Sequence, residues 1–236
     1  MVRRSMARAP ADPEVYKLAA LSAIRMDRLD IAEHALQTAA RLSPSDDLVH
    51  FHLGALYYTK SLFLAARPEL EKATQLNPRY MPALLFLGLT LEEVGDEEST
   101  IATYRKAIDL AEAQRAAREM PYIYLGRFYY RRNRLEDSLP LLEKAVEINP
   151  SSAEAQLQLG KALHALKRDS EAVAALARSV AANSQDPEPH YLLCRIFESE
   201  GRGQAAQEEM KRFQELSRRQ PANDAARRRV VSTSTQ

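Results

Sequence analysis

The chain has 236 residues, of which 45% are hydrophobic and 28% charged, and its formal net charge at pH 7 is +1. This composition supports a sizeable core, but it contains no apolar run of the roughly 18 residues that a membrane-spanning helix needs. A single cysteine, Cys194, excludes an intramolecular disulfide and a cysteine-rich zinc site. Residues 1–12 and 217–236 are basic and the body between them is mildly acidic, whereas nucleic-acid-binding domains are more often basic along a face.

A short pattern recurs six times along the chain, and its clearest copy is Tyr122-x2-Leu125-Gly126-x2-Tyr129. Its copies begin at Tyr16, His50, Leu84, Tyr122, Gln156 and His190. Successive copies lie 34 residues apart, except that the third and fourth are separated by 38. A fixed period of this length is typical of repeat proteins.

A second pattern, small-x3-large-x2-small, follows each copy of the first, except that the sixth copy ends at Phe213. Its copies begin at Ala32, Ala66, Thr100, Ser138, Ala172 and Ala206. Spacings of three and four place residues on one face of a helix, so each unit is predicted to hold two helices. Gly95, Asn133 and Gly201 occupy the intervening turn, where they tolerate a left-handed backbone.

Two details of the pattern predict how the helices pair. Small residues in the Gly54 and Ala66 columns allow close approach, and the Leu53 and Leu70 columns fill the interface. The third unit has four extra residues near 115–118, in a segment rich in strong helix formers. Its second helix is therefore predicted to run about one turn longer, with a four-residue loop as the alternative.

The 34-residue helix–turn–helix unit with these two patterns resembles the tetratricopeptide repeat. The resemblance implies an all-α, right-handed α-solenoid (a superhelix) of six antiparallel helix-turn-helix repeats. The predicted repeats span about 13–46, 47–80, 81–118, 119–152, 153–186 and 187–216. Residues 1–12 and 217–236 are predicted to be a basic N-terminal extension and a basic C-terminal tail, both disordered.

Residue types that carry chemistry do not form a recognisable catalytic or metal-binding motif. His190 and Cys194 are four residues apart, a spacing compatible with a metal, but no further ligand is near in sequence. Both fall in interior columns, so a packed core pair is favoured. We therefore predict no enzyme activity, no catalytic residues, no metal and no cofactor.

The resemblance also implies that a ligand lies in a concave groove lined by the first helix of each unit. The predicted groove residues are Phe51, Tyr58, Leu85, Leu89, Arg127, Tyr130, Arg131, Lys161, His164, Tyr191 and Arg195. The first four form an apolar and aromatic half, and the later units supply cations. Arginine pairs with carboxylates in a bidentate manner, which favours a partner segment that is apolar at one end and acidic at the other.

The predicted function is a non-catalytic scaffold or adaptor that binds a protein or peptide in this groove, with no small-molecule substrate. The alternative is a nucleic-acid-associated factor, or an envelope or secretion assembly factor, that uses the basic tail with the solenoid as a spacer. A further possibility is that the groove arginines only balance the acidic body. The chain shows no signal peptide or transmembrane segment, so a cytoplasmic location is expected.

Overall fold

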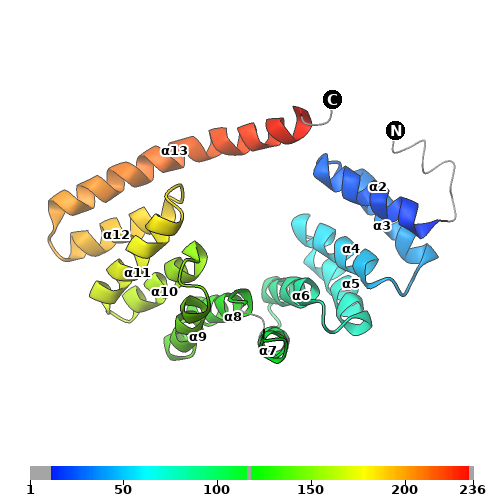
Figure 1. The fold of residues 1–236 in the computed structure, drawn as a ribbon, viewed down its shortest axis with the longest axis horizontal. Helices are drawn as coiled ribbons and strands as arrows, with labels where there is room; N and C mark the ends of the chain where they lie inside the picture. Colours follow the sequence, from blue (N-terminus) through cyan, green and yellow to red (C-terminus); the bar gives the residue numbers. More distant parts are fainter. Residues whose placement is uncertain (1–11, 116–117, 234–236) are drawn as a thin grey trace. The chain divides into compact units, whose positions relative to one another are not determined.

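The computed structural model describes residues 12–115 and 118–233, and all its regular structure in these residues is helical (Figure 1). The helices of the first part are α2 (Pro13–Arg25), α3 (Leu29–Leu42), α4 (Asp47–Thr59), α5 (Phe63–Leu76), α6 (Met81–Val94) and α7 (Glu97–Ala113). Those of the second part are α8 (Met120–Arg131), α9 (Leu135–Ile148), α10 (Ala153–Ala165), α11 (Asp169–Ala182), α12 (Glu188–Ser199) and α13 (Gly203–Thr233). The chain divides into two compact units: the first runs to Leu110 and also takes in the chain from Val231, and the second is Ala111–Val230. Each unit is described by itself.

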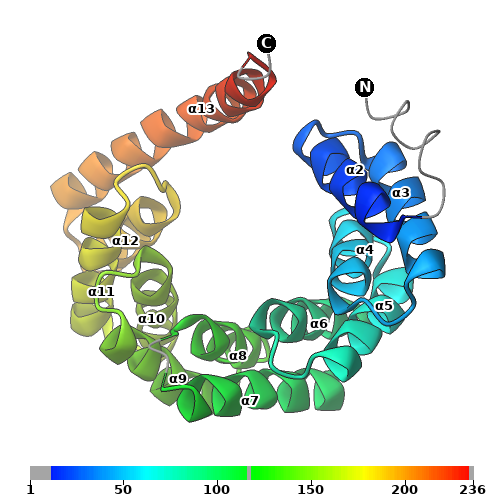
Figure 2. The same cartoon turned by 45° about the vertical axis from the view of Figure 1, so that its right-hand side comes forward.

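Consecutive helices pack as pairs, one pair to each repeat, which confirms the predicted all-α solenoid architecture. In the first unit α2 packs on α3 and α4 on α5, and in the second unit α8 packs on α9 and α10 on α11. The members of each pair lie side by side in both ribbon views (Figures 1 and 2). Neighbouring repeats also meet within a unit, through α3 with α4, α5 with α6, α9 with α10, and α11 with α12.

Glycine in the first helix of four repeats sets how closely its pair can approach. A Cβ atom added to Gly54 would lie 2.5 Å from the Cγ of Leu70, and one added to Gly126 would lie 2.8 Å from the Cγ of Leu142. Real Cβ atoms do not approach other heavy atoms so closely. The predicted close packing across this column is therefore confirmed, with a buried leucine against Gly54, Gly126 and Gly160 and Tyr104 against Gly88.

The turn inside each repeat contains one residue with a positive φ. The predicted turn residues Gly95, Asn133 and Gly201 have φ values of 84°, 55° and 73°. Asp27, Ser61 and Lys167 occupy the same position in the other repeats, with φ values of 55°, 57° and 62°. Sequence reasoning missed these three because serine and lysine seldom adopt the left-handed region. The period of the repeat was the signal that could have found them.

Helix α7 is longer than the second helix of the neighbouring repeats. It has 17 residues, compared with 14 in α5 and α9. The difference is close to one helical turn, so the predicted lengthening of this helix is confirmed. The helix nevertheless ends at Ala113, before residues 115–118. Arg115 has a φ of 48°, and residues 116 and 117 lie outside the described residues.

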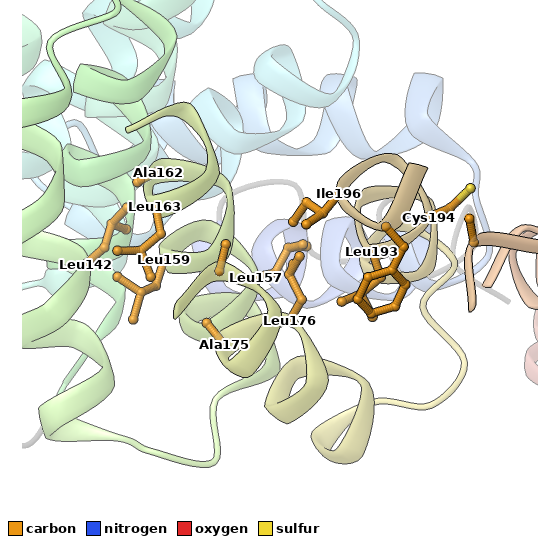
Figure 3. Packing of buried hydrophobic residues seen from close by; sticks show 13 residues of the cluster. Leu142, Leu157, Leu159, Ala162, Leu163, Ala175, Leu176, Leu193, Cys194 and Ile196 are labelled. Carbon is orange, nitrogen blue, oxygen red and sulfur yellow. The ribbon is translucent and has the colours of Figure 1, made fainter. Parts of the chain in front are cut away.

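Buried side chains form separate clusters within the units. In the second unit, Leu142, Leu157, Leu176 and Ile196 come from α9, α10, α11 and α12 and lie in one cluster (Figure 3). In the first unit, one cluster joins α2, α3 and α4, and another joins α4, α5 and α6. Each cluster thus spans more than one repeat, so a repeat is stabilised by its neighbours as well as by its own helix pair.

The ends of the chain were predicted to lack regular structure. Most of the N-terminal extension lies outside the described residues, but Asp12 caps α2 by accepting a 2.9 Å hydrogen bond from the Glu14 backbone N–H. At the other end, α13 continues to Thr233 and so includes residues 217–233. This differs from the predicted disordered tail, and the sequence there is rich in alanine and arginine, which favour helix.

None of the described helices is both long and apolar enough to cross a bilayer.

Candidate functional site

The predicted apolar half of the groove lies on α4 and α6 of the first unit, which contact each other. Phe51 is only 8% exposed. Its ring makes edge-to-face contacts with Tyr80 and Phe86, at centroid distances of 5.1 and 5.6 Å. Phe51 therefore acts mainly as a packing residue between α4 and α6, because Tyr80, at the start of α6, lies against it.

Other members of this half keep accessible surface. Tyr58, Leu85 and Leu89 are half-buried. The Tyr58 ring lies 5.7 Å from the ring of Phe86, a half-buried residue that sequence reasoning did not select. We call Ala55, Tyr58, Leu85, Phe86 and Leu89 the α4–α6 strip. Its residue type was the sequence feature that could have identified it, since Phe86 is an aromatic residue directly after Leu85.

A group of polar side chains lies where α2 meets the start of α4. The Lys17 ammonium lies 2.7 Å from Glu14 and 3.0 Å from Asp46, and the Lys17 and Asp46 side chains are only 15% and 16% exposed. The hydrogen bond to Glu14 is the main cause that raises the pKa of Lys17. Burial, followed by the nearby Lys17 charge, lowers the pKa of His52. His52 is therefore neutral at pH 7, and Lys17 is charged but already paired.

Asp46 couples this ion pair to the start of α4. Its carboxylate accepts hydrogen bonds from the backbone N–H groups of Leu48 and Val49, at 3.0 and 3.1 Å. Burial acts to raise the pKa of Asp46, but the hydrogen bonds from Lys17 and Val49 outweigh it, so the pKa falls below its ordinary 3.8. The ionised form is thus stabilised by folding.

An Asp46→Asn variant is expected to lower the free energy of unfolding by about 1–2 kcal/mol at pH 7. Asparagine still caps a helix, so the loss reports the charge interaction with Lys17. Because the folded-state pKa is lowered, this stabilisation is present above about pH 4 and is lost as the pH falls through the folded-state value. Urea unfolding of both proteins at pH 7 and near pH 3 checks this. Asp30→Asn, at a highly exposed site, is the control, and an equal loss there would contradict the prediction.

The predicted cationic half lies in the second unit, and two of its members are paired within the protein. The Lys161 ammonium on α10 lies 2.5 Å from the Glu188 carboxylate on α12, and the Lys161 side chain is only 16% exposed. His164 Nδ1 lies 2.6 Å from Asp169, at the start of α11. Carboxylates of neighbouring helices therefore occupy the positions that an acidic ligand was predicted to take.

Tyr191 and Arg195 lie one turn apart on α12. The Arg195 guanidinium donates a 3.4 Å hydrogen bond to the Tyr191 hydroxyl and lies 3.9 Å from Glu198. The Tyr191 ring lies 5.3 Å from the ring of Phe213 on α13. The Arg195–Glu198 pair is weak, because both side chains are exposed.

The remaining predicted residues lie on α8. The Arg127 guanidinium lies 5.0 Å from the centroid of the Tyr124 ring. Tyr130 is half-buried and packs against the core cluster of the second unit. Arg131 is exposed at the last position of the helix. Among the described residues, no three His, Cys, Asp or Glu side chains are arranged to hold a metal ion.

Three family models described as tetratricopeptide repeat match the chain, at residues 17–73, 82–114 and 129–196. Together they cover about two thirds of it. A curated relative, the anaphase-promoting complex subunit CDC16 of Saccharomyces cerevisiae, is 26% identical over 145 residues, which are 58% of this chain and 17% of that protein. The chain thus spans less than a fifth of that relative.

Solved structures share the fold at low sequence identity. The type IV pilus biogenesis factor PilW superposes with a TM-score of 0.75 at 15% identity, covering 86% of this chain and 92% of that one. YrrB, described as a TPR protein with an unusual peptide-binding site, superposes with a TM-score of 0.60 at 16% identity, covering 80% of this chain and 95% of that one.

Proposed function

Because the chain belongs to the tetratricopeptide repeat family, we propose that it is a non-catalytic scaffold that binds a partner segment through apolar anchors on the α4–α6 strip. Repeats of this family generally serve protein–protein interaction, and the fold is typically a non-catalytic module. The observation that carries the proposal is the group of half-buried aromatic and aliphatic side chains on two contacting first helices. Aromatic anchors often dominate binding energy, and burying aliphatic side chains beside them adds to it.

The chemistry of the strip indicates the kind of segment it binds. Tyr58 and Phe86 offer aromatic surface, and Leu85 and Leu89 lie one turn apart on α6. An amphipathic helix or an extended segment with apolar side chains can pack on such a surface. YrrB, which shares the fold, is described as having a peptide-binding site; this likeness supports peptide binding only as a proposal for this chain.

The acidic end of the predicted ligand receives less support. Lys161 and His164 already contact carboxylates of the protein, so a ligand carboxylate would have to displace them. Arg131 and Arg195 remain the exposed cations of the predicted set. The alternative role in nucleic-acid binding or secretion rests on Arg227, Arg228 and Arg229, whose side chains lie outside the described part, so no observation favours it. The cytoplasmic location stays a prediction.

Affinity capture from cells that produce the protein tests the proposal. We expect Leu85→Gln/Leu89→Gln to reduce recovery of specific partners by about tenfold or more, because two half-buried anchors are lost. Leu64→Gln is the matched control, since Leu64 lies on α5 and is 79% exposed. Circular dichroism confirms equal helicity in both variants.

A third variant separates the two ends of the predicted ligand. If Arg131→Glu/Arg195→Glu loses the same partners as the strip variant, the segment also has an acidic end. Partners that survive the strip variant unchanged would overturn the proposal, because binding would then occur elsewhere on the protein.

A further inference from the structure

The last repeat contains a small cavity that the proposed function does not use. It lies within the second unit, between the end of α11, the start of α12 and the middle of α13, and has a volume of about 210 Å³. Typical small-molecule pockets are larger, at roughly 300–1,000 Å³. A cavity of this size suits a single side chain or a small ion.

One wall of the cavity is formed by a buried histidine. His190, on α12, is only 3% exposed, and its Nδ1 lies 2.6 Å from a carboxylate oxygen of Glu209 on α13. The other carboxylate oxygen of Glu209 lies 3.6 Å from Arg212. Glu209 therefore fixes the ring orientation and the hydrogen on Nδ1.

The second repeat contains the same arrangement with one difference. His50 occupies the equivalent position, and its Nδ1 lies 2.6 Å from Glu69, 19 residues later, as Glu209 follows His190. The Nε2 of His50 lies 3.0 Å from the Pro44 carbonyl oxygen. Both ring nitrogens of His50 thus face acceptors and have partners within the protein.

In the last repeat, the residue that matches Pro44 is Ser184. Within the described part of the chain, His190 Nε2 makes no hydrogen bond, and both His190 and Ser184 line the cavity. Gln156, in the same column of the fifth repeat, donates to the Pro150 carbonyl at 3.0 Å. The last repeat therefore leaves open a hydrogen-bonding position that the second and fifth repeats fill with their own backbone.

The charges around this position determine what could fill it. Arg212 and Arg219 line the cavity together with Glu215, and Val180 and Leu216 supply apolar surface. Arg219 has no ion-pair partner among the described side chains. The cations favour an anion, whereas Glu215 and nearby Glu209 oppose a second negative charge. Val180 and Leu216 can contact methylene groups.

We propose that this cavity binds the carboxylate of an acidic side chain from a partner protein. The carboxylate accepts a hydrogen bond from His190 Nε2 and pairs with the Arg219 guanidinium, while the methylene stem packs on Leu216. To donate from both ring nitrogens, to Glu209 and to the ligand carboxylate, His190 must carry hydrogens on both of them.

Imidazole NMR of the histidine-labelled full chain, near pH 6, tests the proposal, because the protein has only five histidines. The probe is sodium propionate, which matches a glutamate side chain, with sodium chloride at equal ionic strength as the reference. We expect a saturable shift of the His190 Nε2 signal with propionate. His50 is the internal control, because its Nε2 already faces the Pro44 carbonyl, and its signal is expected to stay unchanged.

Variants and other probes decide among the outcomes. Arg219→Gln is expected to weaken propionate binding by about tenfold, the effect of losing one charge-assisted hydrogen bond, while Arg178→Gln, an exposed change outside the cavity on α11, leaves it unchanged. Equal shifts of His50 and His190, or the same response to chloride, would overturn the proposal. Tighter binding of phosphate, or of N-acetylglycine as a mimic of a chain terminus, would overturn the assignment to an acidic side chain.

The inference stands apart from the proposed role of the α4–α6 strip. None of the residues that line the cavity is changed in the strip variant, and the strip lies in the first unit. If Leu85→Gln/Leu89→Gln loses partner capture but its His190 Nε2 signal still shifts with propionate as in the wild type, both proposals are supported. If propionate causes no shift of the His190 signal while the strip variant loses partner capture as expected, only the cavity proposal is overturned.

Discussion

Replacing Gly88 by alanine is expected to lower the free energy of unfolding by about 2–3 kcal/mol. A Cβ atom at this position would lie 2.2 Å from Cε1 of Tyr104 and 2.6 Å from Cζ. The Tyr104 ring is fully buried, and its hydroxyl donates a 2.5 Å hydrogen bond to Glu92. The ring cannot move aside without breaking that bond or separating α6 from α7.

The control for this change is Gly203→Ala at the start of α13, where an added Cβ meets nothing within 4 Å. Alanine favours helix over glycine by roughly 0.5–1 kcal/mol, so this variant is expected to be neutral or slightly stabilised. Urea unfolding followed by circular dichroism measures both. Equal stabilities for Gly88→Ala and the wild type would show that the α6–α7 pair tolerates a wider separation than the structure indicates.

The contact between glycine and leucine within a helix pair could be predicted from the sequence, because it depends on the number of residues that separate them. Gly54 and Leu70, and equally Gly126 and Leu142, lie 16 residues apart and meet as the pattern requires. The extra turn of α7 was predictable for a related reason, since the segment from Ala111 onward is rich in good helix formers, and the helix uses this segment as far as Ala113. Ser61 and Lys167 were missed because their residue types do not favour the backbone that the turn requires.

The candidate site could be predicted less well, because it depends on which neighbouring side chain reaches a given position. Lys161 was selected as a groove cation from its column, but Glu188 from the next repeat lies against it. Phe51 was predicted to face the groove from its position on α4. In the structure its ring packs against that of Tyr80, the residue before α6. Such contacts depend on side-chain conformation and on loop residues, which the repeat period does not specify.

The same reasoning explains why the cavity beside His190 was not predicted. The sequence placed His190 in an interior column as a packed residue, and its 3% exposure agrees with that. Whether its Nε2 has a partner depends on where the backbone carbonyl of the preceding loop lies. Pro44 and Ser184 occupy the same place in the repeat but differ in this respect.

Replacing Leu142 by alanine is expected to cost about 3–5 kcal/mol, the largest loss among these variants. Leu142 is fully buried, lies against the Gly126 backbone and belongs to the core cluster that joins α9 to α12 (Figure 3). The glycine opposite has no side chain that could fill the space. The loss is therefore expected at the upper part of the usual range for leucine-to-alanine changes.

The location of the loss is as informative as its size. In solenoids each repeat is stabilised mainly by its neighbours, so Leu142→Ala is expected to speed amide hydrogen exchange across α8 to α11 while α2 to α4 stay protected. Leu64→Ala, at a site that is 79% exposed, serves as the matched control and is expected to change stability by less than about 0.5 kcal/mol. If exchange rose equally in α2 to α4, the two units would unfold as one cooperative body, and the stability of this chain would not be the sum of local repeat interfaces.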